Sequence, residues 1–190
     1  MGNINSNMIY SALVSKEDEL RQILHLQEQN LPRNIDDTEM QSQGFVTFKH
    51  SLEVLQQFHA LAPSVIVKNE DKVIAYALTV VNEARYIFPP MESMFALLDT
   101  LQWNNKPFHQ CRYYEMGQIC VAKEYRGKGV VEMLYQKHKE AYSHQYDLLI
   151  TQISTKNFRS LKAHQHIGFQ TITVQKDELD EWAVVLWDWH

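Results

Sequence analysis

The stretch Glu124-Tyr125-Arg126-Gly127-Lys128-Gly129-Val130-Val131 decides the fold, because it follows an apolar, strand-like segment and opens an amphipathic helix. Two glycines one residue apart let the backbone turn sharply and bring several N–H groups together, and the helix adds the partial positive charge of its N-terminus. Arg126 and Lys128 add full positive charges. The stretch therefore predicts a phosphate cradle, although a Gly-x-Gly by itself is equally typical of a tight turn between a strand and a helix.

Size and composition indicate one folded domain over residues 1–190. Of the 190 residues, 45% are hydrophobic and 22% charged, and no segment approaches the ~20 apolar residues of a membrane span. The polar start, Met1 to Asn7, lacks the basic and apolar regions of a signal peptide, so we expect a cytoplasmic protein with no membrane partner. The net charge of −5 disfavours binding to nucleic acid.

The two cysteines, Cys111 and Cys120, give no sign of a disulfide or a metal site. They fall in what reads as one extended segment, which would hold them roughly 30 Å apart. Neither belongs to a Cys-x-x-Cys pair, so the cysteines fit a reducing compartment and we expect no structural metal.

Hydrophobic periodicity predicts strands and helices along the whole chain. Strands are expected at 9–14, 65–67, 73–81, 113–122, 147–153, 169–174 and 182–187. Helices are expected after the N-caps Ser15 and Ser51, briefly around 91–98, from about 127, and over 157–166 with Gly168 closing the last. Residues 85–110 form a long aromatic-rich connection, which is either a substrate-side insertion or a cover for the sheet.

Two ordered motifs in this chain resemble those of the GNAT N-acetyltransferase superfamily. The first, Arg126-Gly127-Lys128-Gly129-Val130-Val131, follows the cofactor motif Gln/Arg-x-x-Gly-x-Gly/Ala, with Val131 in place of the final small residue. The second runs from Asn157-x-x-Ser160 through His164 to Ile167-Gly168-Phe169. The resemblance implies an α/β (α+β) fold, a mixed and mostly antiparallel sheet of about six to seven strands with about four flanking helices. Its fourth and fifth strands would splay apart.

The same resemblance implies that acetyl-CoA, the acyl donor, binds in the gap between the splayed strands. The pantetheine arm would pair with the strand backbone at Ile119 and Val121, on either side of Cys120, where a strand N–H would stabilise the oxyanion. Asn157 and Ser160 would support the cofactor side of the cleft. The pyrophosphate would lie on the N–H groups of Arg126, Gly127, Lys128, Gly129, Val130 and Val131. Lys156, Arg159 and Lys162 are candidates for the adenosine phosphate, or form a solvated face.

Acyl transfer to an amine needs a group that accepts a proton and one that returns it. His164 stands where this superfamily commonly carries a tyrosine that acts as general acid, and it either takes that role or packs beside the cleft. Glu115, on the predicted fourth strand, and Glu83, at the end of the preceding strand, are the candidate bases. His166 does not share a helix face with His164, which excludes a two-histidine metal site.

The resemblance leads us to expect an N-acetyltransferase that moves an acetyl group from acetyl-CoA to a primary amine of a small molecule or protein, by direct attack in a ternary complex. The alternative is a catalytically weak or inactive acyl-CoA-binding module that regulates or senses, suggested by Val131 and His164. A P-loop nucleotide hydrolase is excluded, since Gly129 stands where magnesium would need Ser or Thr. The C-terminal tryptophans could form a homodimer contact or part of the core: Trp182, Trp187 and Trp189.

Overall fold

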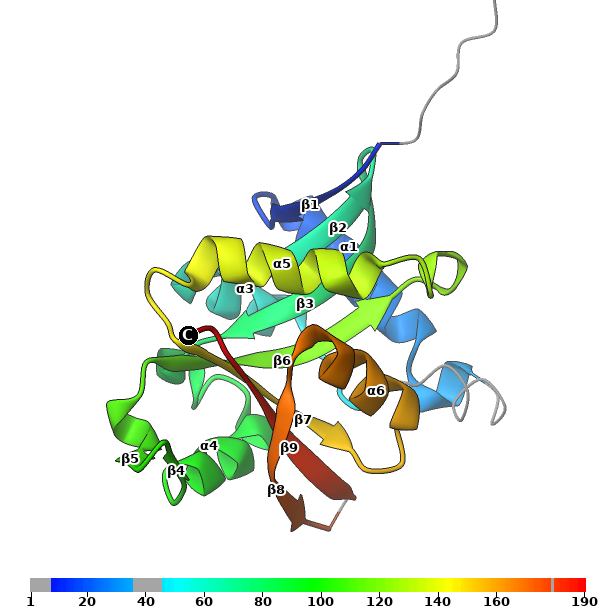
Figure 1. Ribbon diagram of the computed structural model, residues 1–190. Coiled ribbons are helices and arrows are strands. Elements are labelled where there is room, and N and C mark those ends of the chain that lie inside the picture. The colour runs from blue at the N-terminus through cyan, green and yellow to red at the C-terminus, as the bar shows by residue number, and fades with distance from the viewer. Residues whose placement is uncertain (1–7, 36–45, 179) are drawn as a thin grey trace, which may run out of the picture.

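A seven-stranded, mostly antiparallel sheet forms the centre of the molecule (Figure 1). The computed structural model describes residues 8–35, 46–178 and 180–190. The strand order is β1-β2-β3-β6-β7-β9-β8, and among the described strands β6 and β7 are the parallel pair. The strands are β1 (Ile9–Leu13), β2 (Val65–Asn69), β3 (Lys72–Val80), β6 (Tyr113–Val121), β7 (Leu148–Ser154), β8 (Gln170–Lys176) and β9 (Glu181–Asp188).

Helices cover both faces of this sheet (Figure 1). The described helices are α1 (Glu17–Gln29), α3 (Leu52–Leu61), α4 (Glu92–Leu98), α5 (Val130–Tyr142) and α6 (Phe158–Ile167). Ile23, Leu55 and Leu98 belong to the apolar cluster under α1, α3 and α4. Leu134 and Tyr135 of α5 belong to the cluster on the opposite face. The two buried layers account for the apolar periodicity of both the strands and the helices.

The predicted helix starts are confirmed in one case and wrong in the other. Ser51 caps α3, since its side chain accepts a hydrogen bond from the Val54 N–H at 3.3 Å. Ser15 does not cap α1, because the N-cap position belongs to Lys16. The carboxylate of Glu19 accepts the N–H of Ser15 at 2.8 Å and that of Lys16 at 3.2 Å. A side chain within the first turn of α1 therefore pairs the backbone N–H groups at the start of the helix, in place of Ser15.

The helix predicted from about residue 127 begins at Val130. Gly127 and Gly129 adopt φ angles of 71° and 76°, in the left-handed region that helix residues do not occupy. The two glycines therefore belong to the loop between β6 and α5 and not to the first turn of the helix.

The extended segment expected to hold both cysteines is shorter than predicted. Cys111 lies before β6, just after a short 3-10 turn, so only Cys120 belongs to the strand. Both are free thiols, and the thiol of Cys120 is buried.

Residues 85–110 form α4 and a small hairpin of β4 (Gln102–Trp103) and β5 (Lys106–Pro107). The guanidinium of Arg85 fastens this segment through ion pairs with Glu92 at 2.9 Å and Asp99 at 2.7 Å. The indole N–H of Trp103 donates to Asp188 at the end of β9. None of the helices within the described ranges is both long and apolar enough to cross a membrane.

The tryptophans near the C-terminus pack within the chain. Trp182 is 5% exposed, and the ring of Trp187 lies 5.7 Å from that of Phe169 and 5.8 Å from that of Trp189. These contacts give the three tryptophans a role in one chain's own core, and a homodimer stays a prediction.

Candidate active site

The parallel strands β6 and β7 separate after a short stretch of pairing. Their register covers Tyr113–Glu115 of β6 and Leu148–Ile150 of β7, and each strand then continues without its neighbour. At the point of separation the Thr151 hydroxyl donates to the Met116 carbonyl at 2.8 Å. The Thr151 side chain thus pairs the Met116 carbonyl where the backbone pairing between β6 and β7 has ended. Beyond this point the two strands separate and form a cleft.

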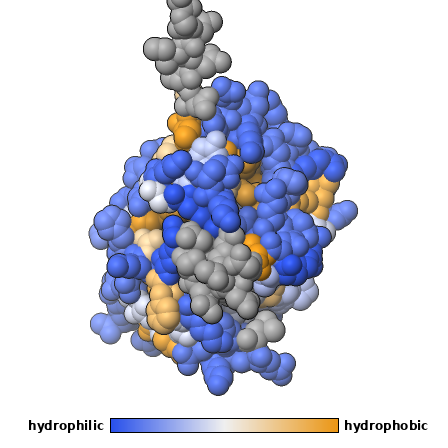
Figure 2. All heavy atoms as spheres, turned by 90° about the vertical axis from the view of Figure 1, so that its right-hand side faces the viewer, coloured by the Kyte–Doolittle hydropathy of each residue, from blue (hydrophilic) through white to orange (hydrophobic). Residues whose placement is uncertain are grey.

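This cleft has a volume of about 380 Å³. Its walls come from β6, β7, the start of α5, the inner face of α6 and residues 46–48. The turn between β6 and α5 lies at the right of Figure 1, and Figure 2 shows that hydrophilic side chains predominate on that side, with smaller hydrophobic patches. A polar opening leading to a partly apolar interior suits a ligand with a charged end and a less polar arm.

The backbone of β6 offers hydrogen-bonding groups to the cleft. The Ala122 N–H donates to the Ile74 carbonyl of β3 at 2.8 Å, and Cys120 lies opposite Tyr76 of β3. Because alternate residues of a strand direct their backbone groups to opposite sides, Ile119 and Val121 direct theirs into the gap. Cys120 directs its own backbone groups toward β3 instead.

A β-bulge interrupts β6 where the cleft narrows. The register with β3 shifts between Ala77, opposite Ile119, and Thr79, opposite Met116, which adds one residue to β6 at Gly117 and Gln118. A Cβ on Gly117 would lie 2.7 Å from the Cγ2 of Val80, so glycine is required there by close approach. The bulge leaves part of the β6 backbone without a partner on β3, beside the cleft.

The turn after β6 places backbone donors at the N-terminus of α5. The first N–H groups of an α-helix have no partner inside it, which here are those of Val130, Val131 and Glu132. All three residues line the cleft, as do Gly127 and Gly129. N–H groups without an intrahelical partner, together with the helix dipole, are the features by which a helix N-terminus can hold an anion. The side chain of Val131 is half-buried and packs against the α5-side core.

The side chain of Arg126 connects three elements at this turn. It donates to the Val121 carbonyl at 3.1 Å and to the Asn30 side-chain oxygen, at the C-cap of α1, at 2.5 Å. Arg126 thus holds the turn against α1 as well as adding charge to the cleft wall. Lys128 is exposed, with its ammonium 5.7 Å from the ring centre of Tyr125.

Helix α6 forms the opposite wall, and its first turn is fixed by Asn157. The Asn157 side chain caps the helix by accepting the Ser160 N–H at 3.2 Å. Asn157, Arg159 and Ser160 all line the cleft. Lys156 forms an ion pair with Asp180 at 2.7 Å, whereas Arg159 and Lys162 line an adjoining surface hollow.

His164 lies in the cleft wall with its ring nitrogens turned to protein partners. Its Nδ1 lies 2.7 Å from the Ser160 carbonyl and its Nε2 lies 2.5 Å from the Tyr135 hydroxyl. The carbonyl must accept, so Nδ1 carries the proton and Nε2 accepts from Tyr135. Burial lowers the pKa of His164 to about 4, and its side chain is therefore neutral near pH 7. This geometry favours packing beside the cleft over proton donation.

Glu115 is the last residue of β6 that pairs with β7, one residue before Met116, and it is not among the residues that line the cleft. It is 2% exposed, and its Oε1 has no hydrogen-bond partner among the residues that the structure describes. Burial raises its pKa well above the usual range, against a smaller lowering by Arg85. Glu83 is exposed in a 3-10 turn after β3. The two candidate bases thus have opposite environments.

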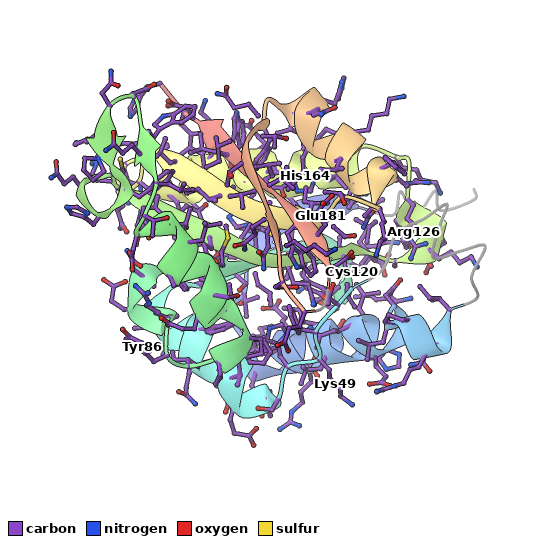
Figure 3. The ribbon with its side chains drawn as sticks, turned by 90° about the horizontal axis from the view of Figure 1, so that it is seen from below. Lys49, Tyr86, Cys120, Arg126, His164 and Glu181 are labelled. Atoms are coloured by element: carbon purple, nitrogen blue, oxygen red, sulfur yellow. The ribbon has the colours of Figure 1, made fainter. Side chains whose placement is uncertain are left out.

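The candidate residues lie on both sides of the gap (Figure 3). Arg126 and Cys120 belong to the β6 side, and His164 lies on α6. Tyr86, at the start of the 85–110 segment, lies at the other end of the view from Arg126 (Figure 3). Within the ranges that the structure describes, residues 85–110 contribute no lining to the cleft, and no group of three or more metal-binding side chains occurs.

Comparison with known proteins decides the family. The model of the acetyltransferase (GNAT) family matches residues 23–169. This chain belongs to the GNAT acetyltransferase family. The matched range runs from α1 through β7 and α6, and so includes the splayed strands, the glycine turn before α5 and the Asn157 cap.

Solved structures with the same fold extend over almost the whole chain. The ribosomal-protein-S18-alanine N-acetyltransferase of Escherichia coli has a TM-score of 0.61 at 12% identity, with 95% of this chain and 94% of that chain covered. Arabidopsis thaliana Naa50, solved with the bisubstrate analogue CoA-Ac-MVNAL, gives 0.62 at 13%, with 95% and 99% covered. Salmonella typhimurium yncA, solved with its cofactor acetyl-CoA, gives 0.61 at 12%, with 96% and 95% covered. A comparison with curated proteins found no match.

Sequence reasoning missed two residues that line this GNAT cleft. Thr151 joins the separating strands, and Gln118 lies at the bulge. Gly117 was the available signal, since a glycine inside a strand pattern indicates a bulge or a close backbone approach. Thr151 had no comparable signal, because its role depends on where β7 leaves β6.

Proposed function

We propose that this GNAT protein transfers the acetyl group of acetyl-CoA to a primary amine, by direct attack in a ternary complex. The observation that carries the proposal is the cleft between β6 and β7, with backbone groups of Ile119 and Val121 on one wall and unpaired N–H groups of α5 at its end. A charged pyrophosphate and an amide-bearing arm would find complementary groups there. The fit rests on the backbone and is independent of the departure at Val131.

Acetyl-CoA supplies an activated acyl group as a thioester. The N–H groups of the turn and of the first residues of α5 would hold its pyrophosphate, from Arg126 through Gly127, Lys128 and Gly129 to Val130 and Val131. Ile119 and Val121 would pair with the pantetheine arm, although the Val121 carbonyl already accepts from Arg126. Asn157 and Ser160 would keep α6 in place, and Arg159 and Lys162 are the proposed partners of the adenosine phosphate.

Glu115 is the proposed general base, acting through a water molecule. The attacking amine must lose a proton as its nitrogen bonds to the thioester carbonyl carbon, and this proton would pass through water to the Glu115 carboxylate. Burial raises the pKa of this carboxyl, and a higher pKa makes its ionised form a stronger base. Backbone N–H groups beside the bulge of β6 would stabilise the oxyanion before the C–S bond breaks.

The leaving thiolate takes up a proton from solvent, and Glu115 returns to solvent the proton that it received from the amine. An unperturbed thiol has a pKa near ~8.5, so the thiolate is a good leaving group and can be protonated by solvent. His164 would be neutral with both nitrogens engaged, so we propose that it positions α6 against Tyr135 of α5 rather than donating the proton.

Calorimetry with acetyl-CoA and an assay of thiol release with a panel of primary amines test the proposal. We expect binding together with amine-dependent release of CoA. Binding without turnover over the whole panel would instead support the catalytically inactive acyl-CoA-binding module. The absence of both would overturn the assignment of the cleft.

A further inference from the structure

A buried polar network lies directly behind the cleft and none of its members belongs to the motifs discussed above. Its residues come from four segments: Gln27 of α1, His50 before α3, Tyr76 of β3 and Gln118 at the bulge of β6. Their exposed fractions are 0%, 4%, 0% and 8%. Burying a polar group without a hydrogen-bond partner lowers the stability of the folded state, so these four side chains are expected to be paired with one another or with the backbone.

The side-chain oxygen of Gln118 accepts two hydrogen bonds. The Tyr76 hydroxyl and the Gln27 amide each donate to it at 2.6 Å. The Gln118 amide in turn donates to the Phe48 carbonyl at 2.8 Å. One side chain at the bulge thus connects the sheet and α1 to the segment 46–50.

The segment 46–50 is held at three further points, all on the last turns of α1. The His50 N–H donates to the Gln27 side-chain oxygen at 2.7 Å, and the Gln27 amide lies 2.9 Å from His50 Nδ1. The Val46 N–H donates to the Asn30 carbonyl at 3.2 Å. Asn30 also accepts from Arg126, so α1 fixes this segment and the phosphate turn from the same end.

The segment so held forms one wall of the cleft. Val46, Thr47 and Phe48 line it, as do Gln152 of β7 and Trp182 of β9. The Val46 end of this wall lies near the turn before α5, because Val46 and Arg126 both donate to Asn30. The Phe48 end lies beside the β6 bulge, since the Phe48 carbonyl accepts from Gln118, and it is therefore the end that an acceptor would meet at the proposed reaction centre. The ring of Phe48 packs 5.9 Å from that of Phe88, which joins the wall to the 85–110 segment.

We propose that Gln27 and Gln118 are positioning residues that fix the segment 46–50 as the acceptor-side wall of the cleft. Neither side chain would touch the reacting atoms. Each acts through Phe48 and His50, and sets the distance between that wall and the β6 bulge. The inference rests on the proposed function for its account of the acceptor, but the arrangement of the wall can be measured without any ligand.

The test compares Gln27→Met and Gln118→Met with Gln22→Met. Gln22 is a matched control, because it also lies on α1 and accepts the Val73 N–H at 2.7 Å, at a place that does not line the cleft. Hydrogen exchange of the amides of residues 46–50 is followed by mass spectrometry in the absence of ligand. We expect a loss of protection of about tenfold in Gln27→Met and Gln118→Met, and less than about twofold in Gln22→Met, as one lost hydrogen bond predicts.

A kinetic measurement separates positioning from general loosening. For the panel amine that the wild type acetylates best, the KM for the amine should rise about tenfold in Gln27→Met and Gln118→Met, while the dissociation constant of acetyl-CoA stays within about twofold. Tyr76→Phe removes a donor but keeps every bond to the segment 46–50, and should change the KM by less than about twofold.

Equal exchange in wild type and Gln27→Met, or equal loosening in Gln22→Met, would overturn the proposal. So would an unchanged amine KM in variants whose segment has loosened. If the wild type binds acetyl-CoA and turns over no amine, the proposed enzyme fails, and the exchange comparison still decides whether these glutamines hold the wall.

Discussion

Replacing Glu115 with glutamine should stabilise the protein near neutral pH while it slows acetyl transfer. The carboxyl is 2% exposed, its Oε1 has no hydrogen-bond partner, and burial raises its pKa well above the usual range. Arg85 offsets little of this, since its guanidinium is paired with Glu92 and Asp99. A buried group that resists ionisation makes the folded state less stable at high pH, which a neutral amide avoids.

The sign follows from the protons bound in each state. The unfolded carboxyl ionises near pH ~4.3, whereas the folded one keeps its proton to a higher pH. Between these two pKa values the unfolded state binds fewer protons, so the free energy of unfolding falls as pH rises, by at most ~1.4 kcal/mol per pH unit. The contribution of the neutral Glu115 carboxyl to the free energy of unfolding is therefore fully present below pH ~4.3 and is lost as the pH rises to the folded pKa. Glu115→Gln does not titrate and so shows no such loss.

Urea denaturation followed by tryptophan fluorescence, from about pH 4 to pH 9, measures this difference. The free energy of Glu115→Gln minus that of wild type should rise with pH and then level off at the folded pKa of Glu115. The acidic limb of kcat/KM should lie at that same pH, and the variant should lose about 10²-fold to 10⁴-fold in rate. Glu83→Gln is the control, because Glu83 is exposed and should show neither effect. Parallel stability curves for wild type and Glu115→Gln would refute the reasoning.

Three further substitutions test the cleft. Thr151→Val leaves the Met116 carbonyl unpaired at the apex and should cost about 1–3 kcal/mol in urea denaturation, so an unchanged midpoint would contradict its role. Gly129→Ala adds a Cβ with no atom within 4 Å, so only the φ of 76° is strained and thermal unfolding should show about 1–2 kcal/mol, whereas a much larger loss would indicate a clash. The folded pKa of His164 is about 4, so the wild type loses stability as the pH falls from ~6.5 through that value. His164→Gln should reduce this dependence of stability on pH and leave the pH profile of turnover unshifted. A shifted profile would instead support His164 as the general acid.

The sequence by itself predicted the order of the elements and the family. Strands and helices with buried faces repeat apolar residues over a few positions. Helix ends are marked by Ser51, Gly168 and the glycines after β6, whose backbone preferences act within a few residues. Such signals are contained in short stretches, which is why the glycine turn before α5 and the helix near Asn157 could be predicted from their residues.

Only the tertiary structure decided what the candidate side chains face. His164 and Tyr135 are far apart in the sequence and meet because α5 and α6 pack together, and the burial of His164 in this packing lowers its pKa and keeps its ring neutral. The environment of Glu115 likewise depends on burial between strands. Gln27 and Gln118 carried no motif, since a glutamine reveals its partners only when distant segments meet. Backbone preferences depend on neighbouring residues and can be read from a short stretch of sequence, whereas the burial and hydrogen bonding of side chains depend on contacts between segments that are far apart in the sequence.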